Sequence, residues 1–204
     1  MCIRDRFWTA ELNENIEQLQ KEAYLIRKND KDGVIKSNSG FQGYHSKDIR
    51  DLNNLPGTNQ LLKQIINAVN AIHQISRQGD LQLTNFWINI SGKGSSNTPH
   101  THSGLTYSGV FFIKVPKEMK GGRFLFYRNF NEADFISTEY MGHFKEGYQM
   151  QGYDYPINTI SPKENMLVVF PAWVPHAVEI NLSDEERISL SFNFKLNRTF
   201  SKVK

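Results

Sequence analysis

The sequence has almost no cysteine: the 204 residues contain one, Cys2. A single thiol cannot form a disulfide within the chain, so the fold cannot depend on one. Cys2 also lies in an opening stretch, Met1–Arg6, that has no hydrophobic periodicity and resembles translated sequencing-adapter read-through. We therefore exclude residues 1–6 from the predicted fold as non-native or disordered.

Long apolar runs are also absent. The longest, Val110–Ile113 and Met166–Pro171, are far shorter than the roughly 20 residues that a membrane-spanning helix needs. No charged segment followed by an apolar one indicates a signal peptide. The sequence thus predicts a soluble, cytoplasmic protein without a membrane partner.

Neither sign of charge dominates, since 24 Lys and Arg stand against 21 Asp and Glu. These charges are scattered along the chain, so the sequence does not indicate a nucleic-acid partner. The hydrophobic fraction of 39% and the length suit one globular domain with a substantial core. We predict a single domain over residues 7–204.

Helical periodicity is confined to the N-terminal part, residues 7–78. Apolar residues recur at helical spacing from Thr9 to about Lys28, with Thr9 as the expected N-cap. After a polar connector, the apolar repeat Leu62–Ile72 predicts a second helix with Thr58 as its N-cap. Two helices are therefore expected before the rest of the fold.

Residues 80–197 consist mainly of short runs rich in Val, Ile and aromatic residues, separated by Gly, Pro and Asn. Such runs are typical of strands. The predicted strands are Leu81–Ile90, Leu105–Val115, Gly122–Tyr127, Met166–Phe170, Ala177–Ile180 and Arg187–Leu196. Because no helical pattern separates them, we predict an antiparallel barrel or jelly roll with the two helices packed on one sheet face, a β-rich α+β fold.

A long, aromatic and irregular segment interrupts these strands at residues 129–162. Long loops inside compact domains are commonly lids or binding loops. An insertion that packs on itself fits the sequence equally well.

Three histidines are candidate metal ligands. His100 and His102 flank Thr101 at the expected start of a strand, so both imidazoles would project from one face. His176 follows a strand and a turn and is expected to begin the next strand. Each histidine taken alone would more often be an ordinary hydrogen-bonded residue. Three histidines on two predicted strands, with no cysteine ligand, favour a metal that binds imidazole, and both zinc and iron fit.

The predicted last strand has two alternating rows. The polar row consists of Arg187, Ser189, Ser191 and Asn193, and the apolar row of Ile188, Leu190, Phe192 and Phe194. Inside a barrel and beside a metal, guanidinium, hydroxyl and amide groups would form a surface that binds a carboxylate. The alternative is an edge strand with a solvated polar face.

These motifs resemble those of the 2-oxoglutarate- and Fe(II)-dependent oxygenase superfamily. Its members combine a His-x-carboxylate pair, a distal His and a later Arg, often in an Arg-x-Ser motif. The residues that match here are His100, His176, Arg187 and Ser189. More narrowly, segments 97–116, 170–173 and 187–193 look like a bacterial, phage and marine-metagenome family of such oxygenases. The resemblance extends over about residues 7–196.

The resemblance implies a double-stranded β-helix that binds Fe(II), 2-oxoglutarate and dioxygen, with ascorbate as a possible reductant. It implies that Arg187 and Ser189 hold the C5 carboxylate of 2-oxoglutarate. The reaction would be hydroxylation of an unknown prime substrate, with no catalytic residue beyond the metal site. Asn89 matches a position at which some members contact the cosubstrate. The alternative is a strand-end Asn that caps the following loop.

One position departs from the superfamily, because His102 stands where most members have Asp or Glu. Either His100, His102 and His176 all bind the metal, or His102 stays off it, as in the aspartyl/asparaginyl β-hydroxylases, whose carboxylate position is vacant. A neutral imidazole leaves the site one negative charge short, which should weaken Fe(II) retention.

Two other functions remain compatible with the sequence. One is a non-catalytic, cupin-like barrel that binds metal and a carboxylated ligand. The other is a three-histidine cupin dioxygenase without 2-oxoglutarate, in which Arg187 and Ser189 would have no role. The sequence predicts no oligomeric state.

Overall fold

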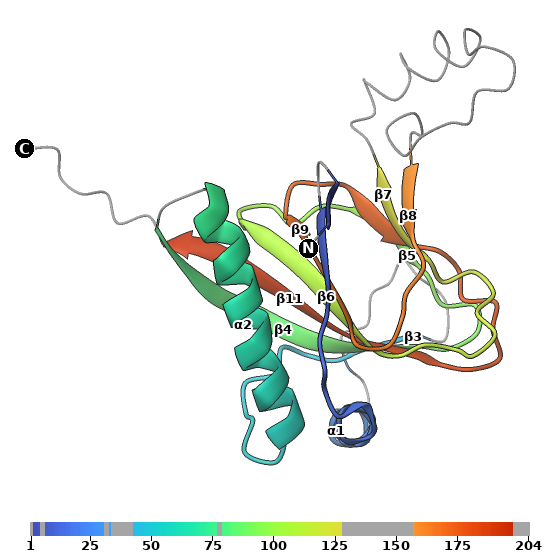
Figure 1. The fold of residues 1–204 in the computed structure, drawn as a ribbon. Coiled ribbons are helices and arrows are strands. Elements are labelled where there is room, and N and C mark those ends of the chain that lie inside the picture. Colours follow the sequence, from blue (N-terminus) through green and yellow to red (C-terminus); the bar gives the residue numbers. More distant parts are fainter. Residues whose placement is uncertain are drawn as a thin grey trace, which may run out of the picture.

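The computed structural model describes residues 2–4, 7–30, 33, 43–76, 79–127 and 157–197. Two helices and eleven strands lie in these residues (Figure 1). In chain order they are β1 (Cys2–Arg4), β2 (Phe7–Glu11), α1 (Ile16–Asn29), β3 (Gly43–His45), α2 (Pro56–Ser76), β4 (Asp80–Ser91), β5 (Asn97–His100), β6 (Tyr107–Lys114), β7 (Phe124–Tyr127), β8 (Ile157–Ile160), β9 (Met166–Pro171), β10 (His176–Val178) and β11 (Arg187–Asn197).

The strands form two antiparallel sheets. The larger has the order β1-β2-β9-β6-β11-β4-β3 and the smaller the order β5-β10-β7-β8. An apolar core draws on β6, β7, β8, β9 and the turn after β9, and so joins both sheets: Val110, Phe112, Phe124, Phe126, Ile160, Val168, Phe170 and Val174. The predicted double-stranded β-helix is confirmed.

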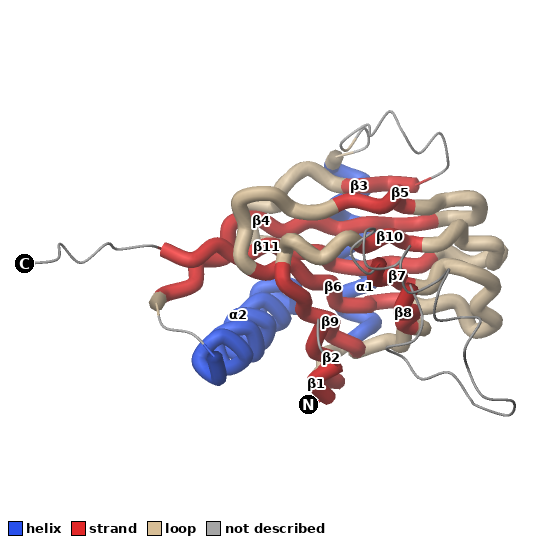
Figure 2. Tube along the Cα trace, turned by 90° about the horizontal axis from the view of Figure 1, so that it is seen from above, coloured by secondary structure: helices blue, strands red, loops and turns tan. Residues whose placement is uncertain are grey.

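A second apolar core joins the helices to the other face of the larger sheet. Leu19 of α1 and Ile65 of α2 belong to the same cluster as Ile88 of β4 and Leu190 and Phe192 of β11. Figure 2 shows both helices on one side of this sheet. Because β6 meets one core on each face, it is buried along most of its length.

The predicted start of the first helix is wrong. Phe7–Glu11 form β2, which pairs with β9, so Thr9 lies in a strand opposite Val168. Helix α1 begins only at Ile16, and Asn15 is its N-cap, accepting a hydrogen bond from the Gln18 amide. Tertiary pairing with β9 therefore overrides the helical spacing of this segment.

The predicted cap of the second helix is also wrong, because α2 begins at Pro56, before Thr58. Proline suits the first turn of a helix, where its missing N–H has no partner to lose. The cap comes from α1: the Glu22 carboxylate accepts hydrogen bonds from the amides of Gly57 and Thr58 and from the Thr58 hydroxyl, at 2.6–2.8 Å. Glu22 is 3% exposed, so this contact is a buried link between the helices.

All six predicted strands are present, and the missed ones are short. β3, β5 and β8 have three or four residues each, too few for a clear alternation of apolar and polar residues. The described residues also form β1 from Cys2–Arg4, paired with β2, within the stretch 1–6 that was predicted to lie outside the fold. Within the segment predicted as irregular, β8 occupies Ile157–Ile160, and residues 128–156 lie outside the described part.

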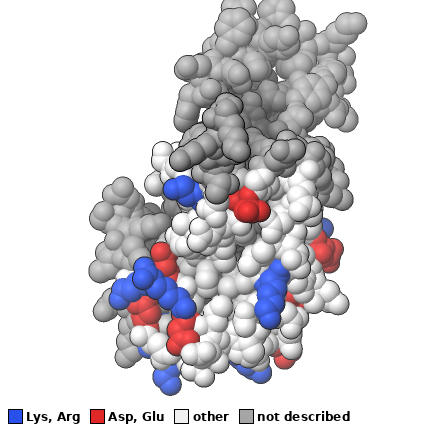
Figure 3. Space-filling model, turned by 90° about the vertical axis from the view of Figure 1, so that its left-hand side faces the viewer, with Lys and Arg blue, Asp and Glu red and all other residues white. Residues whose placement is uncertain are grey.

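The surface agrees with the scattered charges of the sequence. Figure 3 shows Lys and Arg interspersed with Asp and Glu over the described part of one face. Neither helix in the described ranges is long and apolar enough to cross a membrane.

The link between the helices generates a stability prediction. We expect Glu22→Gln to lower the free energy of unfolding by about 1 to 3 kcal/mol. The substitution removes the buried charge that binds the α2 N-terminus, and it places the amide NH2 group of Gln opposite N–H or O–H donors that the carboxylate now accepts from. Urea denaturation measures this change. As a control on the same helix, the exposed Glu17→Gln should cost about 0.5 kcal/mol or less. Equal effects of the two substitutions would contradict the capping role.

Candidate functional site

Three histidines converge between the two sheets. His100 and His176 are direct partners in the register of β5 and β10, and His102 lies in the loop that follows β5. One ring nitrogen of each lies within 4.8 Å of one from each of the others. His176 begins its strand as predicted, but His100 ends β5 instead of beginning a strand, and His102 lies outside any strand. The His102 imidazole therefore reaches the other two because the loop after β5 turns back, and not because side chains alternate along one strand.

Backbone carbonyls set the protonation of two rings. The Nδ1 of His100 lies 2.7 Å from the Thr98 carbonyl oxygen, and the Nδ1 of His176 lies 2.9 Å from the Val174 carbonyl oxygen. A carbonyl can only accept, so both Nδ1 atoms carry the hydrogen, and each neutral ring has its lone pair on Nε2, the atom that a metal would bind.

The spacing of the rings also fits a metal. The Nε2 atoms of His102 and His176 lie 3.3 Å apart. Two nitrogens bound at about 2.1 Å and roughly a right angle are about 3 Å apart. The cluster thus matches adjacent positions around one ion.

The turn after β9 holds the histidines in place. The amide of His102 donates to the Ala172 carbonyl at 2.9 Å, and the Ala172 amide donates to the Thr106 carbonyl at 3.1 Å. The Val174 amide closes the turn on the Pro171 carbonyl at 3.0 Å. This turn therefore fixes the His102 loop on one side and delivers His176 on the other.

Aromatic rings surround the cluster. His176, 4% exposed, packs against Phe170 and Phe124 at centroid distances of 4.5 and 5.5 Å. His102 lies 6.3 Å from the Trp87 ring. Burial, and next the electrostatic effect of the neighbouring His100 ring, lowers the pKa of His176 to about 3. Its imidazole is therefore neutral at neutral pH, the form that binds metals.

Arg187 opens β11, as predicted, and is 5% exposed. Its Nη1 donates to the Gly122 carbonyl at 3.0 Å, its Cζ lies 5.8 Å from the Phe112 ring centroid, and its Nε has no hydrogen-bond partner. Burial lowers its pKa to about 10, so the group stays charged at neutral pH. No Asp or Glu in the described ranges forms a salt bridge with it. Within the described ranges this buried cation therefore lacks an anion, an unfavourable state that an anionic ligand would relieve.

The polar row of β11 faces the space between the sheets. Its members alternate with the apolar row, which packs with the helices in the second core. Ser189 and Asn193 are buried, and Asn193 accepts a hydrogen bond from Ser108 of β6 at 2.7 Å. The edge-strand alternative is wrong, because β11 lies between β6 and β4.

Asn89 lies on the same face as this row. It is opposite Ser189 in the register of β4 and β11, and its amide donates to the Ser191 hydroxyl at 3.0 Å. It is thus an interior strand residue and not the strand-end cap that the alternative required. Its contact with a cosubstrate stays a prediction.

Several groups of the site had no sequence signal. The carbonyls of Thr98, Val174 and Gly122 orient His100, His176 and Arg187, but any residue type supplies a carbonyl. The one available signal is that each of the three residues adjoins a proline or a glycine, which indicates a restricted or unusual backbone there.

A double-stranded β-helix with clustered histidines between its sheets and a buried arginine opening its last strand has the features of the 2-oxoglutarate-dependent oxygenases. The model of a family described as “Putative 2OG-Fe(II) oxygenase” matches residues 85–193. The chain belongs to this family. The matched range includes all the candidate site residues, and the resemblance noted in the sequence is confirmed.

Solved structures share the fold. A prolyl-4-hydroxylase from Pseudomonas putida has a TM-score of 0.63 at 16% identity, covering 94% of this chain and 93% of that one. The viral collagen prolyl hydroxylase of Paramecium Bursaria Chlorella virus-1, solved with 2OG, has a TM-score of 0.62 at 10% identity over 94% and 96%.

HygX from Streptomyces hygroscopicus, solved with nickel and 2-oxoglutarate, has a TM-score of 0.57 at 11% identity over 95% and 83%. At such identities, the three likenesses establish the fold alone. No curated protein matches the chain in sequence.

The burial of His176 generates a pH prediction for the metal-free protein. Its folded pKa, about 3, lies below the unfolded value of about 6.5, so the fold favours the neutral ring. The resulting stability is fully present above pH 6.5 and is lost as the pH falls toward 3. In an NMR titration, the His176 ring signals should stay constant from pH 8 to about 5. A midpoint near 6.5 would show that the ring is hydrated and that the site is open.

Proposed function

We propose that the protein is an Fe(II)- and 2-oxoglutarate-dependent oxygenase that hydroxylates a prime substrate. His100 and His176 would hold the metal, together with His102 or water, and Arg187 and Ser189 would hold the cosubstrate. The observation that carries the proposal is the buried, charged Arg187, whose Nε has no partner. Like His176 of the histidine cluster, it contacts the apolar core between the two sheets.

The donor set fits the metal. Three imidazoles without a thiolate suit a mid-row divalent ion such as Fe(II), and two of the rings are already held with Nε2 unprotonated. Bound Fe(II) would supply the activation of dioxygen, which couples hydroxylation to the oxidative decarboxylation of 2-oxoglutarate to succinate and carbon dioxide.

The residues of the chain bind and orient the cosubstrate. Arg187 is charged at neutral pH and has donors left for the C5 carboxylate after its bond to Gly122. The Ser189 hydroxyl lies two residues along the same face and can donate to that carboxylate. Asn89 is cross-strand from Ser189, and we assign it a polar contact to the cosubstrate.

Apolar residues exclude water from this space. Val110 and Phe112 of β6, Phe124 of β7 and Val168 of β9 belong to the core between the sheets. Their burial keeps the surroundings of Arg187 poorly solvated, which strengthens its attraction for a carboxylate.

Two other functions make different demands on the same residues. The three-histidine cluster itself is compatible with a cupin dioxygenase that uses no cosubstrate, but that function leaves the buried charge of Arg187 without an anion. A silent binding protein would bind the metal and a carboxylated ligand without turnover. Purified protein supplied with iron, ascorbate and 2-oxoglutarate should release succinate under our proposal. No succinate release with metal and 2-oxoglutarate bound would support the silent barrel.

The metal assignment predicts the behaviour of three variants. His176→Ala should abolish iron binding at stoichiometric concentrations, because too few protein donors remain to compete with water. His102→Ala should weaken iron binding less than His100→Ala if His102 stays off the metal, and equally if the site uses three histidines. Metal analysis of the dialysed variants measures both comparisons. Unchanged iron content in His176→Ala would refute the site.

The cosubstrate assignment predicts a selective defect. Arg187→Met keeps most of the stem and removes the charge, which typically costs about 3 to 5 kcal/mol for one partner of a buried ion pair. At about tenfold per 1.4 kcal/mol, the affinity for 2-oxoglutarate should fall at least about a hundredfold. Anaerobic calorimetric titration of the metal-loaded protein measures this change.

Two controls define the outcome. Arg187→Lys should retain part of the affinity, because Lys supplies the charge without the bidentate geometry. Iron content should hardly change in either variant. Arg187 is structural if Arg187→Met binds 2-oxoglutarate normally, or if it loses iron and fold together.

A further inference from the structure

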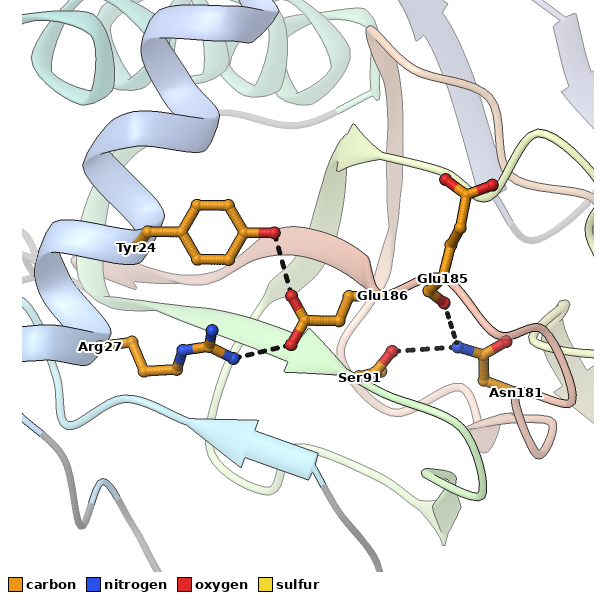
Figure 4. A network of polar contacts seen from close by, with 6 residues as sticks. All are labelled: Tyr24, Arg27, Ser91, Asn181, Glu185 and Glu186. Atoms are coloured by element: carbon orange, nitrogen blue, oxygen red, sulfur yellow. Dashed lines mark hydrogen bonds and ion pairs between the residues drawn. The ribbon is translucent and has the colours of Figure 1, made fainter.

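A buried amide holds the backbone on both sides of Arg187. Asn181, in the segment between β10 and β11, is 2% exposed. Its Nδ2 donates to the carbonyls of Ser91 at 3.0 Å and Glu185 at 3.1 Å, and its Oδ1 accepts from the Ser183 amide at 3.0 Å. Figure 4 shows the side chain reaching from its own segment to both carbonyls. Each hydrogen-bonding group of this amide therefore has a backbone partner.

The carbonyls of Ser91 and Glu185 lie where the end of β4 pairs with the start of β11. Ser91 is the last residue of β4 and is the register partner of Arg187, the first residue of β11. Glu185 lies two residues before Arg187. One amide group thus ties the end of β4 to the chain entering β11, at the point where the Arg187 side chain departs.

The same segment also positions the acceptor of Arg187. The Gly122 amide donates to the Ile180 carbonyl at 3.0 Å, and Gly121 forms a β-bridge with Asn181. Gly121 has a φ of +66°, and a Cβ there would lie 2.2 Å from the Ile180 oxygen, so glycine allows this close approach. Since Gly122 supplies the carbonyl that Arg187 binds, Asn181 and its neighbours fix both partners of that hydrogen bond.

Helix α1 holds the strand entry from the other side. The Glu186 carboxylate accepts hydrogen bonds from the Tyr24 hydroxyl at 2.9 Å and from Arg27 Nη1 at 2.8 Å (Figure 4). Glu186 directly precedes Arg187, and its side chain leaves the strand entry toward α1. The backbone of Arg187 is therefore tied to β4 through Asn181 and to α1 through Glu186.

We propose that Asn181 and Glu186 form a clamp that positions Arg187 for the C5 carboxylate of 2-oxoglutarate. The inference rests on the proposed function of Arg187. Asn181 and Glu186 are positioning residues and act only through Arg187. A bidentate guanidinium contact depends on angle as well as distance, so a looser strand entry weakens the contact without removing the charge.

The direct test is Asn181→Ala in the full chain. Replacement of residues that orient a binding group typically costs about 10- to 100-fold in affinity or activity, so the Kd for 2-oxoglutarate should rise about tenfold or more. The affinity for Fe(II) should stay within about threefold, because the clamp contacts no histidine of the cluster. Anaerobic 2-oxoglutarate titration of the Fe(II)-loaded protein and a separate iron titration measure the two values.

A double variant separates positioning from general destabilisation. If Asn181 acts through Arg187, adding Asn181→Ala to Arg187→Met should lower 2-oxoglutarate affinity no further. Glu22→Gln is the matched control, since it also weakens a buried link between two elements, and it should leave 2-oxoglutarate affinity unchanged. Tyr24→Phe removes the hydroxyl that donates to Glu186 of the clamp and should raise the Kd for 2-oxoglutarate about threefold. This variant tests the clamp if Asn181→Ala does not fold.

The outcomes distinguish failure of the clamp from failure of the proposed oxygenase function. If the wild type does not bind 2-oxoglutarate, or if Arg187→Met binds it normally, the proposed function itself fails. If those two behave as proposed, the clamp is overturned by wild-type affinity in Asn181→Ala. It is also overturned if Glu22→Gln weakens binding as much, or if the double variant loses the full additional factor. Wild-type affinity in Tyr24→Phe overturns it when Asn181→Ala does not fold.

Discussion

The charge of Arg187 is the constraint on which the site depends. A guanidinium that is 5% exposed and remains protonated at neutral pH needs an anion, and no carboxylate of the described residues forms a salt bridge with it. Its neighbours restrict the orientation of the side chain. The Gly122 carbonyl accepts a hydrogen bond from it, the Phe112 ring lies beside the guanidinium, and Asn181 binds the backbone just before β11. In the proposed function a ligand carboxylate would neutralise this charge, which would link the stability of this region to ligand binding.

The metal side of the site depends on backbone geometry in the same way. The turn between β9 and β10 binds the His102 loop through Ala172 and sends the Val174 carbonyl to the ring of His176. Ring orientation and protonation are therefore set before a metal arrives, which lowers the cost of binding it. In the proposed function, the larger sheet would bind the cosubstrate through the polar row of β11, and the smaller sheet would bind the metal through β5 and β10.

Sequence reasoning succeeded where one strong local pattern coincides with a structural role. The alternation of residues 187–194 predicted a strand with a polar inner face, and the three histidines do converge. It failed where tertiary contacts decide. Thr9 lies in a strand because β9 pairs with it, and Thr58 is not a cap because Glu22 of the other helix supplies one. The carbonyls have no side-chain signature, and no local pattern indicates that Asn181 contacts the end of β4 or that Glu186 contacts α1, so only the structure finds these contacts.

The central claim is that one site binds Fe(II) and 2-oxoglutarate together. Anaerobic addition of 2-oxoglutarate to the Fe(II)-loaded protein tests it most directly, by means of the weak metal-to-ligand charge-transfer absorption of a chelate between the two. We predict a saturable band at one equivalent each of iron and 2-oxoglutarate per chain. Stoichiometric iron binding without such a band at saturating 2-oxoglutarate would contradict the account.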